Sequence, residues 1–174
     1  MNKFVHSAIL ALATCSPQAH AEPNGAETTE PRNAAAGFAV TSWMTVVDAL
    51  GTHCSKLQGE AGKQSMDALL WWQRRNMLYV DAAFNYIADI EDHILAQQGE
   101  SARQQFRSDR KAEFSGSARQ AQAAWFPDGA IDGNSCLRFA THVANGSLDL
   151  ERHKEFYPIL RKLSADMRRQ QGDP

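Results

Sequence analysis

Apolar residues recur at spacings of three and four along most of the chain, and no stretch shows the sustained alternation of a β-strand. This pattern predicts an all-α fold, a single irregular bundle of about five or six helices. The first predicted helix begins at Thr41 or Ser42 and ends near Leu57. Its apolar stripe consists of Trp43, Val46, Val47, Leu50, Cys54 and Leu57.

The second predicted helix is the longest and spans residues 65–96. Ser65 is its candidate N-cap, and Gly99 follows its end, where a glycine commonly terminates a helix. Apolar side chains occupy most of its circumference, so we expect a central helix that touches several neighbours. The apolar positions are Met77, Val80, Phe84, Ile87, Ile90 and Ile94.

Three further helical stretches follow. Residues 100–125 are polar and alanine-rich, and Ser115-Gly116-Ser117 is a candidate break. A short helix is predicted from Asn134 or Ser135 to Asn145, where Gly146 ends it. The last helix is expected over residues 149–169, kinked or split at Pro158, because proline lacks the backbone donor that a helix interior needs.

Both ends of the chain are predicted to lie outside the helical domain, which spans residues 38–170. Residues 1–21 have the three parts of a cleavable signal peptide: Lys3, an apolar run, and an A-x-A site that ends at Ala21. Residues 22–37 are polar and rich in Pro, Gly and Ala, which predicts a flexible leader, and residues 171–174 are expected to be a disordered tail. The chain is therefore expected to be periplasmic or secreted.

No transmembrane segment is predicted. The apolar run of the signal is shorter than the roughly 20 residues that span a bilayer. Arg or Asp interrupts every later apolar stretch. A lipoprotein acylated at Cys15 is the alternative, but Thr14 stands where a small Gly or Ala is usual, so cleavage at Ala21 is favoured.

The cysteine count predicts a disulfide. Once Cys15 leaves with the signal, Cys54 and Cys136 remain, and an even number in an exported chain favours a bond between them. Closing a loop of about 80 residues would stabilise the fold by ~4 kcal/mol. Two free buried thiols are the alternative, and zinc is not predicted because no CxxC pair is present.

Charge and motifs exclude several classes of function. The chain has 18 Lys and Arg against 20 Asp and Glu, a net charge of −2, which becomes −3 when Lys3 is lost with the signal. This balance argues against a nucleic-acid binder, which would show a strongly basic face. No glycine-rich phosphate loop, HExxH or CxxCH motif is present, so neither a cofactor nor a metal is predicted.

A candidate interface lies in the long helix at Trp71, Trp72, Arg74 and Arg75. The two tryptophans point about 100° apart, so both can be buried only if the helix is covered on two sides. An exposed tryptophan beside arginines would offer the pairing that is enriched at protein interfaces. The alternative is two core tryptophans with solvated arginines.

A candidate polar site lies near the end of the same helix at Asp89, Glu91, Asp92 and His93. Carboxylates late in a helix oppose its dipole, so a compensating partner is expected. Arg103 or Arg107 of the next helix is favoured over a divalent cation. Glu91 also falls on the apolar side of the helix, where burial would raise its pKa and suit it to acid–base catalysis.

Three functional hypotheses follow. The leading one is an exported, non-catalytic binding or accessory protein whose partner is another protein in the periplasm. The second is an immunity protein or inhibitor of a toxin or cell-wall enzyme. Small exported helical proteins with one disulfide resemble the immunity proteins that guard against type VI secretion amidases, a resemblance of architecture that assigns no residues.

The third hypothesis is a metal- or ligand-handling enzyme that uses Glu91 and His93. The hypotheses predict different surfaces. A binding protein should expose an apolar patch that includes Trp71 or Trp72. An enzyme should have a pocket in which Glu91 meets a histidine from another helix.

Overall fold

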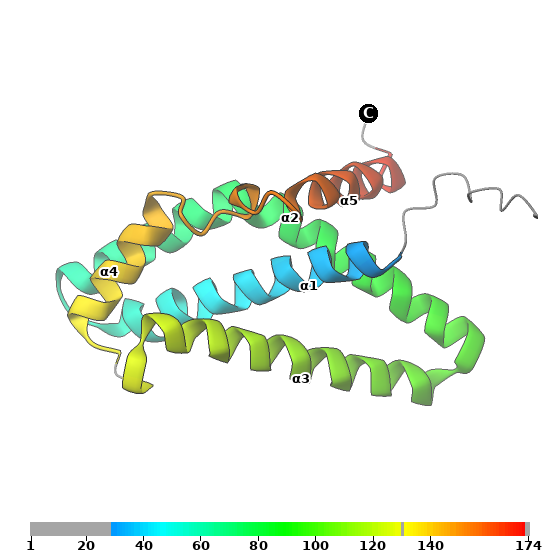
Figure 1. Ribbon diagram of the computed structural model, residues 1–174, viewed down its shortest axis with the longest axis horizontal. Coiled ribbons are helices and arrows are strands. Elements are labelled where there is room, and N and C mark those ends of the chain that lie inside the picture. The colour runs from blue at the N-terminus through cyan, green and yellow to red at the C-terminus, as the bar shows by residue number, and fades with distance from the viewer. Residues whose placement is uncertain (1–28, 130, 173–174) are drawn as a thin grey trace, which may run out of the picture.

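The computed structural model describes residues 29–129 and 131–172 (Figure 1). All regular structure in these residues is helical, with no strand, which confirms the predicted all-α fold around a long central helix. The predicted signal peptide lies outside the described residues. The helices are α1 (Thr29–Val46), α2 (Glu60–Gln98), α3 (Glu100–Trp125), α4 (Gly133–Ala144) and α5 (Tyr157–Gln170).

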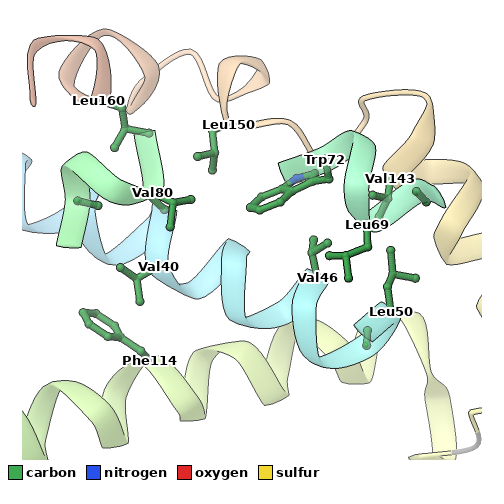
Figure 2. Packing of buried hydrophobic residues seen from close by; sticks show 14 of the residues in the cluster. Val40, Val46, Leu50, Leu69, Trp72, Val80, Phe114, Val143, Leu150 and Leu160 are labelled. Atoms are coloured by element: carbon green, nitrogen blue, oxygen red, sulfur yellow. The ribbon is translucent and has the colours of Figure 1, made fainter. Parts of the chain in front are cut away.

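Helix α2 is the centre of the fold and contacts each of the other four α-helices. Trp72 and Val80 on α2 are fully buried, against side chains of α1 and of the segments that follow α3 (Figure 2). The helix begins five residues earlier than predicted. Ser65 is therefore not its cap but a buried residue whose hydroxyl donates to the carbonyl of Ala61 at 2.7 Å.

Helix α1 begins within the segment that was predicted to be a flexible leader, so that prediction was wrong for its described part. Residues 29–37, expected to be flexible, form the first half of α1, and Ala35 and Ala36 are buried. Small side chains on both helices allow α1 to cross close to α2 (Figure 1). Arg32 then ties this half of α1 to Asp166 of α5 at 2.6 Å.

By length and composition, Thr29–Lys56 could cross a membrane, with a mean hydropathy of 1.3 over its most apolar window. Of that window, 44 % is buried inside the bundle. The core helix of a protein outside a membrane has the same length and composition, so this is weak evidence for a span.

A tight connection leads from α1 to α2. Residues Val47–His53 form a π-helical segment and Cys54–Lys56 a 3₁₀ turn. Cys54 is bonded to Cys136 of α4; the Cα atoms are 5.6 Å apart and the two residues are separated by 82 in sequence. Both cysteines are fully buried, and the predicted disulfide is confirmed.

The first turn of α2 packs closely under this connection at Gly62. A Cβ atom at position 62 would lie 2.0 Å from the carbonyl oxygen of Leu57, so backbone would have to move. We expect Gly62→Ala to lower the free energy of unfolding by about 2 kcal/mol, measured by urea denaturation. Gly116→Ala is the matched control: Gly116 lies within α3 with open space around it, so the change should be neutral or stabilising. Equal effects at both positions would contradict this.

The remaining helices follow the predicted breaks with one exception. Ser115-Gly116-Ser117 does not interrupt α3. The Asp132 carboxylate caps α4 by accepting the Ser135 N–H at 2.7 Å, and this hydrogen bond holds the pKa of Asp132 below its usual range. Pro158 falls in the first turn of α5, and a 3₁₀ turn, Leu150–Arg152, precedes that helix, so the predicted last helix is split.

Candidate functional site

The two adjacent tryptophans of α2 have opposite environments. Trp72 is fully buried, and its indole N–H donates to the carbonyl of Leu148 at 3.0 Å (Figure 2). Trp71 is 54 % exposed. The structure therefore separates the predicted interface residues: one tryptophan belongs to the core and the other lies on the surface.

The two arginines divide in the same way. Arg74 lies over the ring of Trp71, with its guanidinium carbon 5.4 Å from the ring centroid. Arg75 points to the other side of α2, where its Nε donates to the Asp149 carboxylate at 2.6 Å and its Nη2 to the Val143 carbonyl at 2.8 Å. Arg75 is therefore a structural residue, and only Arg74 remains a candidate for binding.

Asn76 completes the contact between α2 and the segment that joins α4 to α5. Its amide donates to Asp149 at 3.0 Å, and its carbonyl oxygen accepts the Leu150 N–H at 2.8 Å. Asn76 is 1 % exposed, and Asp149 is similarly buried. The Asn76 amide and the Asp149 carboxylate thus both have hydrogen-bond partners.

This buried network was not predicted from the sequence. Trp72, Arg75 and Asn76 stand three and four positions apart, so they share one face of α2. A polar pair on the same face as a core tryptophan was the available signal. Asp149, the acceptor of Arg75 and Asn76, lies 73 positions after Asn76. Helical periodicity carries no information over that distance.

Large apolar side chains are exposed on the first half of α2. Met66 is 42 % exposed, Leu70 45 % and Leu78 41 %. Leu78 lies within about 20° of Trp71 around the helix, and Leu70 and Met66 follow about 100° and 140° away, so the four side chains spread over the exposed half of the helix. We call these four residues and Arg74 the α2 patch. Beside it, a depression of about 390 Å³ between α2 and α4 is lined by Trp71, Asp67 and Thr141 among others.

Glu91 of the candidate polar site forms an ion pair with the next helix. Glu91 pairs with Arg107 of α3 at 2.6 Å, which confirms one of the two arginine partners predicted for this end of α2. Arg103, the other, pairs with Glu100 in its own helix. The described residues contain no group of three or more His, Cys, Asp or Glu that could hold a metal ion.

The other members of the polar site point to solvent or contact α5. Asp92 and His93 are exposed. Asp89 accepts a long hydrogen bond of 3.4 Å from Gln170. The Glu91 side chain is 16 % exposed, and its carboxylate is held by Arg107 rather than by a histidine. The structure therefore does not assemble the four residues around a common point.

A second concave region lies between α1, α3 and the α4–α5 connection. It is a cleft of about 390 Å³ lined by Phe38, Trp125 and His153 among others. His153 accepts the Phe156 N–H at its Nδ1 over 3.4 Å, and its ring stacks on that of Phe156 with the centroids 4.4 Å apart. Phe38 contacts both rings, with its centroid 4.5 Å from that of His153 and 5.1 Å from that of Phe156, so the three rings form one aromatic cluster.

Two tyrosines on α2 make contacts to other helices. The Tyr79 and Tyr157 hydroxyls lie 3.1 Å apart, and this hydrogen bond, with burial, raises the pKa of Tyr79 to about 12. Tyr86 donates to the Asn33 side chain at 2.9 Å, and burial raises its pKa as well. Both phenols stay neutral at physiological pH and fasten α2 to its neighbours.

Comparisons of this chain with protein-family models, with curated proteins and with solved structures find no match.

Proposed function

We propose that this protein is an exported, non-catalytic binding protein that contacts another protein through the α2 patch. The observation that carries the proposal is the exposure of four large apolar side chains along one half of a single helix, with Arg74 over Trp71. Clustered exposed apolar side chains of this kind are typical of interaction sites, and Trp and Arg are among the residues that contribute most to binding.

The scaffold under the patch supports this role. Residues on the opposite face of the same segment, Trp72 and Asn76, are buried and hydrogen-bonded. The helix cannot move there without breaking these bonds. A rigid surface loses little conformational entropy on binding, so more of its contact energy appears as affinity.

The chemistry of the patch indicates the kind of partner. Its centre is apolar and aromatic, and Arg74 adds a cation whose contact is the Trp71 ring. A complementary protein surface would present apolar side chains with a carboxylate opposite Arg74. An inhibitor or immunity protein that blocks a toxin or cell-wall enzyme is the sharper form of the same proposal.

The proposed location is the periplasm or the exterior, after cleavage near Ala21. The Cys54–Cys136 bond supports it, because structural disulfides persist in oxidising compartments. Any partner is then expected in that compartment.

Truncation of the exposed tryptophan tests the proposal. We expect Trp71→Ala to weaken partner binding by about 2 kcal/mol, about thirtyfold, because an interface tryptophan loses its whole contact area. The melting temperature should barely change, since the side chain is exposed. A photo-crosslinker placed at Leu70 would first trap and identify the partner. The affinity of that partner for the unsubstituted protein and for Trp71→Ala would then be measured by titration calorimetry.

Leu95→Ala is the matched control, because Leu95 is an exposed leucine on the same helix outside the α2 patch. Crosslinking at position 95 should not trap the partner that position 70 traps. Full affinity in Trp71→Ala, or identical crosslinks from both positions, would contradict the proposal.

A further inference from the structure

The cleft between α1, α3 and the α4–α5 connection has the size of a small-molecule site. Its volume of about 390 Å³ falls within the range of about 300–1,000 Å³ that is typical of ligand pockets. α1 contributes residues between Phe38 and Val46, α3 contributes Ala121 and Trp125, and the connection contributes residues 147–149, 152 and 153. Every described residue that lines the cleft belongs to these three segments, so the cleft is separate from the α2 patch.

Aromatic rings line the cleft, and neighbouring rings hold them in place. Phe38 contacts His153 with the ring centroids 4.5 Å apart, and the planes of His153 and Phe156 stack at an angle of 7°. On α3, the Trp125 ring contacts that of Phe139 with the centroids 5.2 Å apart. Because each ring is already packed against another within the chain, the cleft is preformed. Aromatic walls favour an aromatic ligand, which can contact them by its edges and faces.

The polar groups of the cleft are mainly hydrogen-bond donors that lack an acceptor among the described residues. In this part of the chain, the Arg152 guanidinium has no ion pair or hydrogen bond, and neither the Trp125 indole N–H nor the Ser42 hydroxyl has a hydrogen-bond partner. His153 accepts the Phe156 N–H at its Nδ1, so the proton of the neutral ring is on Nε2, a further donor. A ligand with several acceptor atoms would satisfy these groups.

Asp149, the one carboxylate among the described residues of the cleft, is already paired. Its side chain is 5 % exposed, and it accepts from the Arg75 guanidinium at 2.6 Å and from the Asn76 amide at 3.0 Å. The charge of Asp149 is therefore compensated from α2, whereas Arg152 is exposed at the cleft and unpaired among the described residues. This balance of charge favours an anionic ligand.

We propose that the cleft is a binding site for a small aromatic carboxylic acid. Its ring would lie among Phe38, Trp125 and His153, and its carboxylate would pair with Arg152, whose planar guanidinium can donate two parallel hydrogen bonds to the two oxygens. A carboxylic acid is ionised at neutral pH, whereas an amine of the same shape would place a second cation beside Arg152. The inference goes beyond the proposed function, because it adds a ligand at a second surface.

Titration of the disulfide-bonded protein with phenylpropionate tests the proposal, with phenylpropanol and phenylpropylamine as analogues of the same shape. We expect phenylpropionate to bind with a dissociation constant below about 1 mM, and the alcohol at least about fivefold more weakly. The amine should not bind measurably. Calorimetry gives the affinities, and the indole N–H resonance of Trp125 in NMR spectra should shift as the site fills.

Arg152→Gln isolates the contribution of the charge. It should weaken phenylpropionate binding at least about tenfold and leave phenylpropanol binding unchanged, because the aromatic walls remain. Arg168→Gln is the matched control, since Arg168 is an exposed arginine of α5 outside the cleft and its loss changes the net charge equally. Both variants should keep the melting temperature of the unsubstituted protein. Equal losses of affinity in the two variants would overturn the assignment of Arg152.

Filling the cleft tests its location. Ala121→Leu should weaken the binding of both the acid and the alcohol at least about tenfold, because the larger side chain occupies the space between the aromatic walls. Ala124→Leu, at an exposed alanine of the same helix outside the cleft, should change neither. Unchanged binding in Ala121→Leu would place the ligand elsewhere and overturn the proposal.

Three further outcomes would also overturn the proposal. They are the absence of phenylpropionate binding up to about 10 mM, binding of the amine as tight as that of the acid, and tighter binding of octanoate, an acid with an aliphatic body. Trp71→Ala should leave phenylpropionate binding unchanged, because Trp71 does not line this cleft. Since none of these measurements involves the partner of the α2 patch, failure here is distinguishable from failure of the proposed function.

Discussion

Removing the Cys54–Cys136 bond is expected to lower the free energy of unfolding by about 4 kcal/mol. The bond closes a loop of 82 residues that contains α2 and α3 in full, and cutting it frees that loop in the unfolded chain. Cys54→Ser and Cys136→Ser should each lower the melting temperature by a similar amount. Urea denaturation of the oxidised protein and of both variants measures the effect.

The double variant separates a bond from two independent buried thiols. Either single substitution already abolishes the bond, so Cys54→Ser with Cys136→Ser should be no less stable than either alone. Reducing agent should destabilise the unsubstituted protein and leave the variants unchanged. Additive losses in the double variant would show that the cysteines act separately.

Substitution of Asp149 is expected to have the second largest effect. Asp149→Ala should lower the free energy of unfolding by about 3 kcal/mol, because it leaves the Arg75 guanidinium and the buried Asn76 amide without their acceptor. The segment from Val143 to Leu150 should then loosen first. Hydrogen exchange should show faster exchange at the Leu150 amide, which Asn76 accepts.

Two further variants make this prediction specific. Asp149→Asn retains an acceptor for Asn76 but loses the charge opposite Arg75, so its loss should be smaller than that of Asp149→Ala. Asp92→Ala removes an exposed carboxylate from α2 and should change stability by no more than about 0.5 kcal/mol. A loss at position 149 as small as the one at position 92 would contradict the structural role of the network.

Local periodicity predicted the elements in which large apolar residues are regularly spaced. α4 was found to within two residues of each end, and the central position of α2 followed from its apolar circumference. The first half of α1 was missed because its contacts are made by alanines, which are common both in linkers and in closely packed helices. A small side chain shows its packing role only when the opposing helix is present.

The candidate site was predicted only in part, for a similar reason. The sequence singled out Trp71 and Arg74, but it equally singled out Trp72 and Arg75, which the fold uses internally. Periodicity shows that neighbouring residues face different directions and does not show which direction is covered. The covered direction is determined by the segment around Leu148 and Asp149, which contacts α2 from more than 70 positions away in the sequence.

The Arg32–Asp166 ion pair has a practical consequence for immobilising the protein on a surface. It fixes the start of α1 beside the end of α5, so both described ends of the chain leave the bundle on the same side (Figure 1). The first half of α2, with Trp71, lies toward the other end of the molecule. A surface tether at either terminus should therefore present the α2 patch outward, and attachment through the N-terminus or the C-terminus should give equivalent binding sensors.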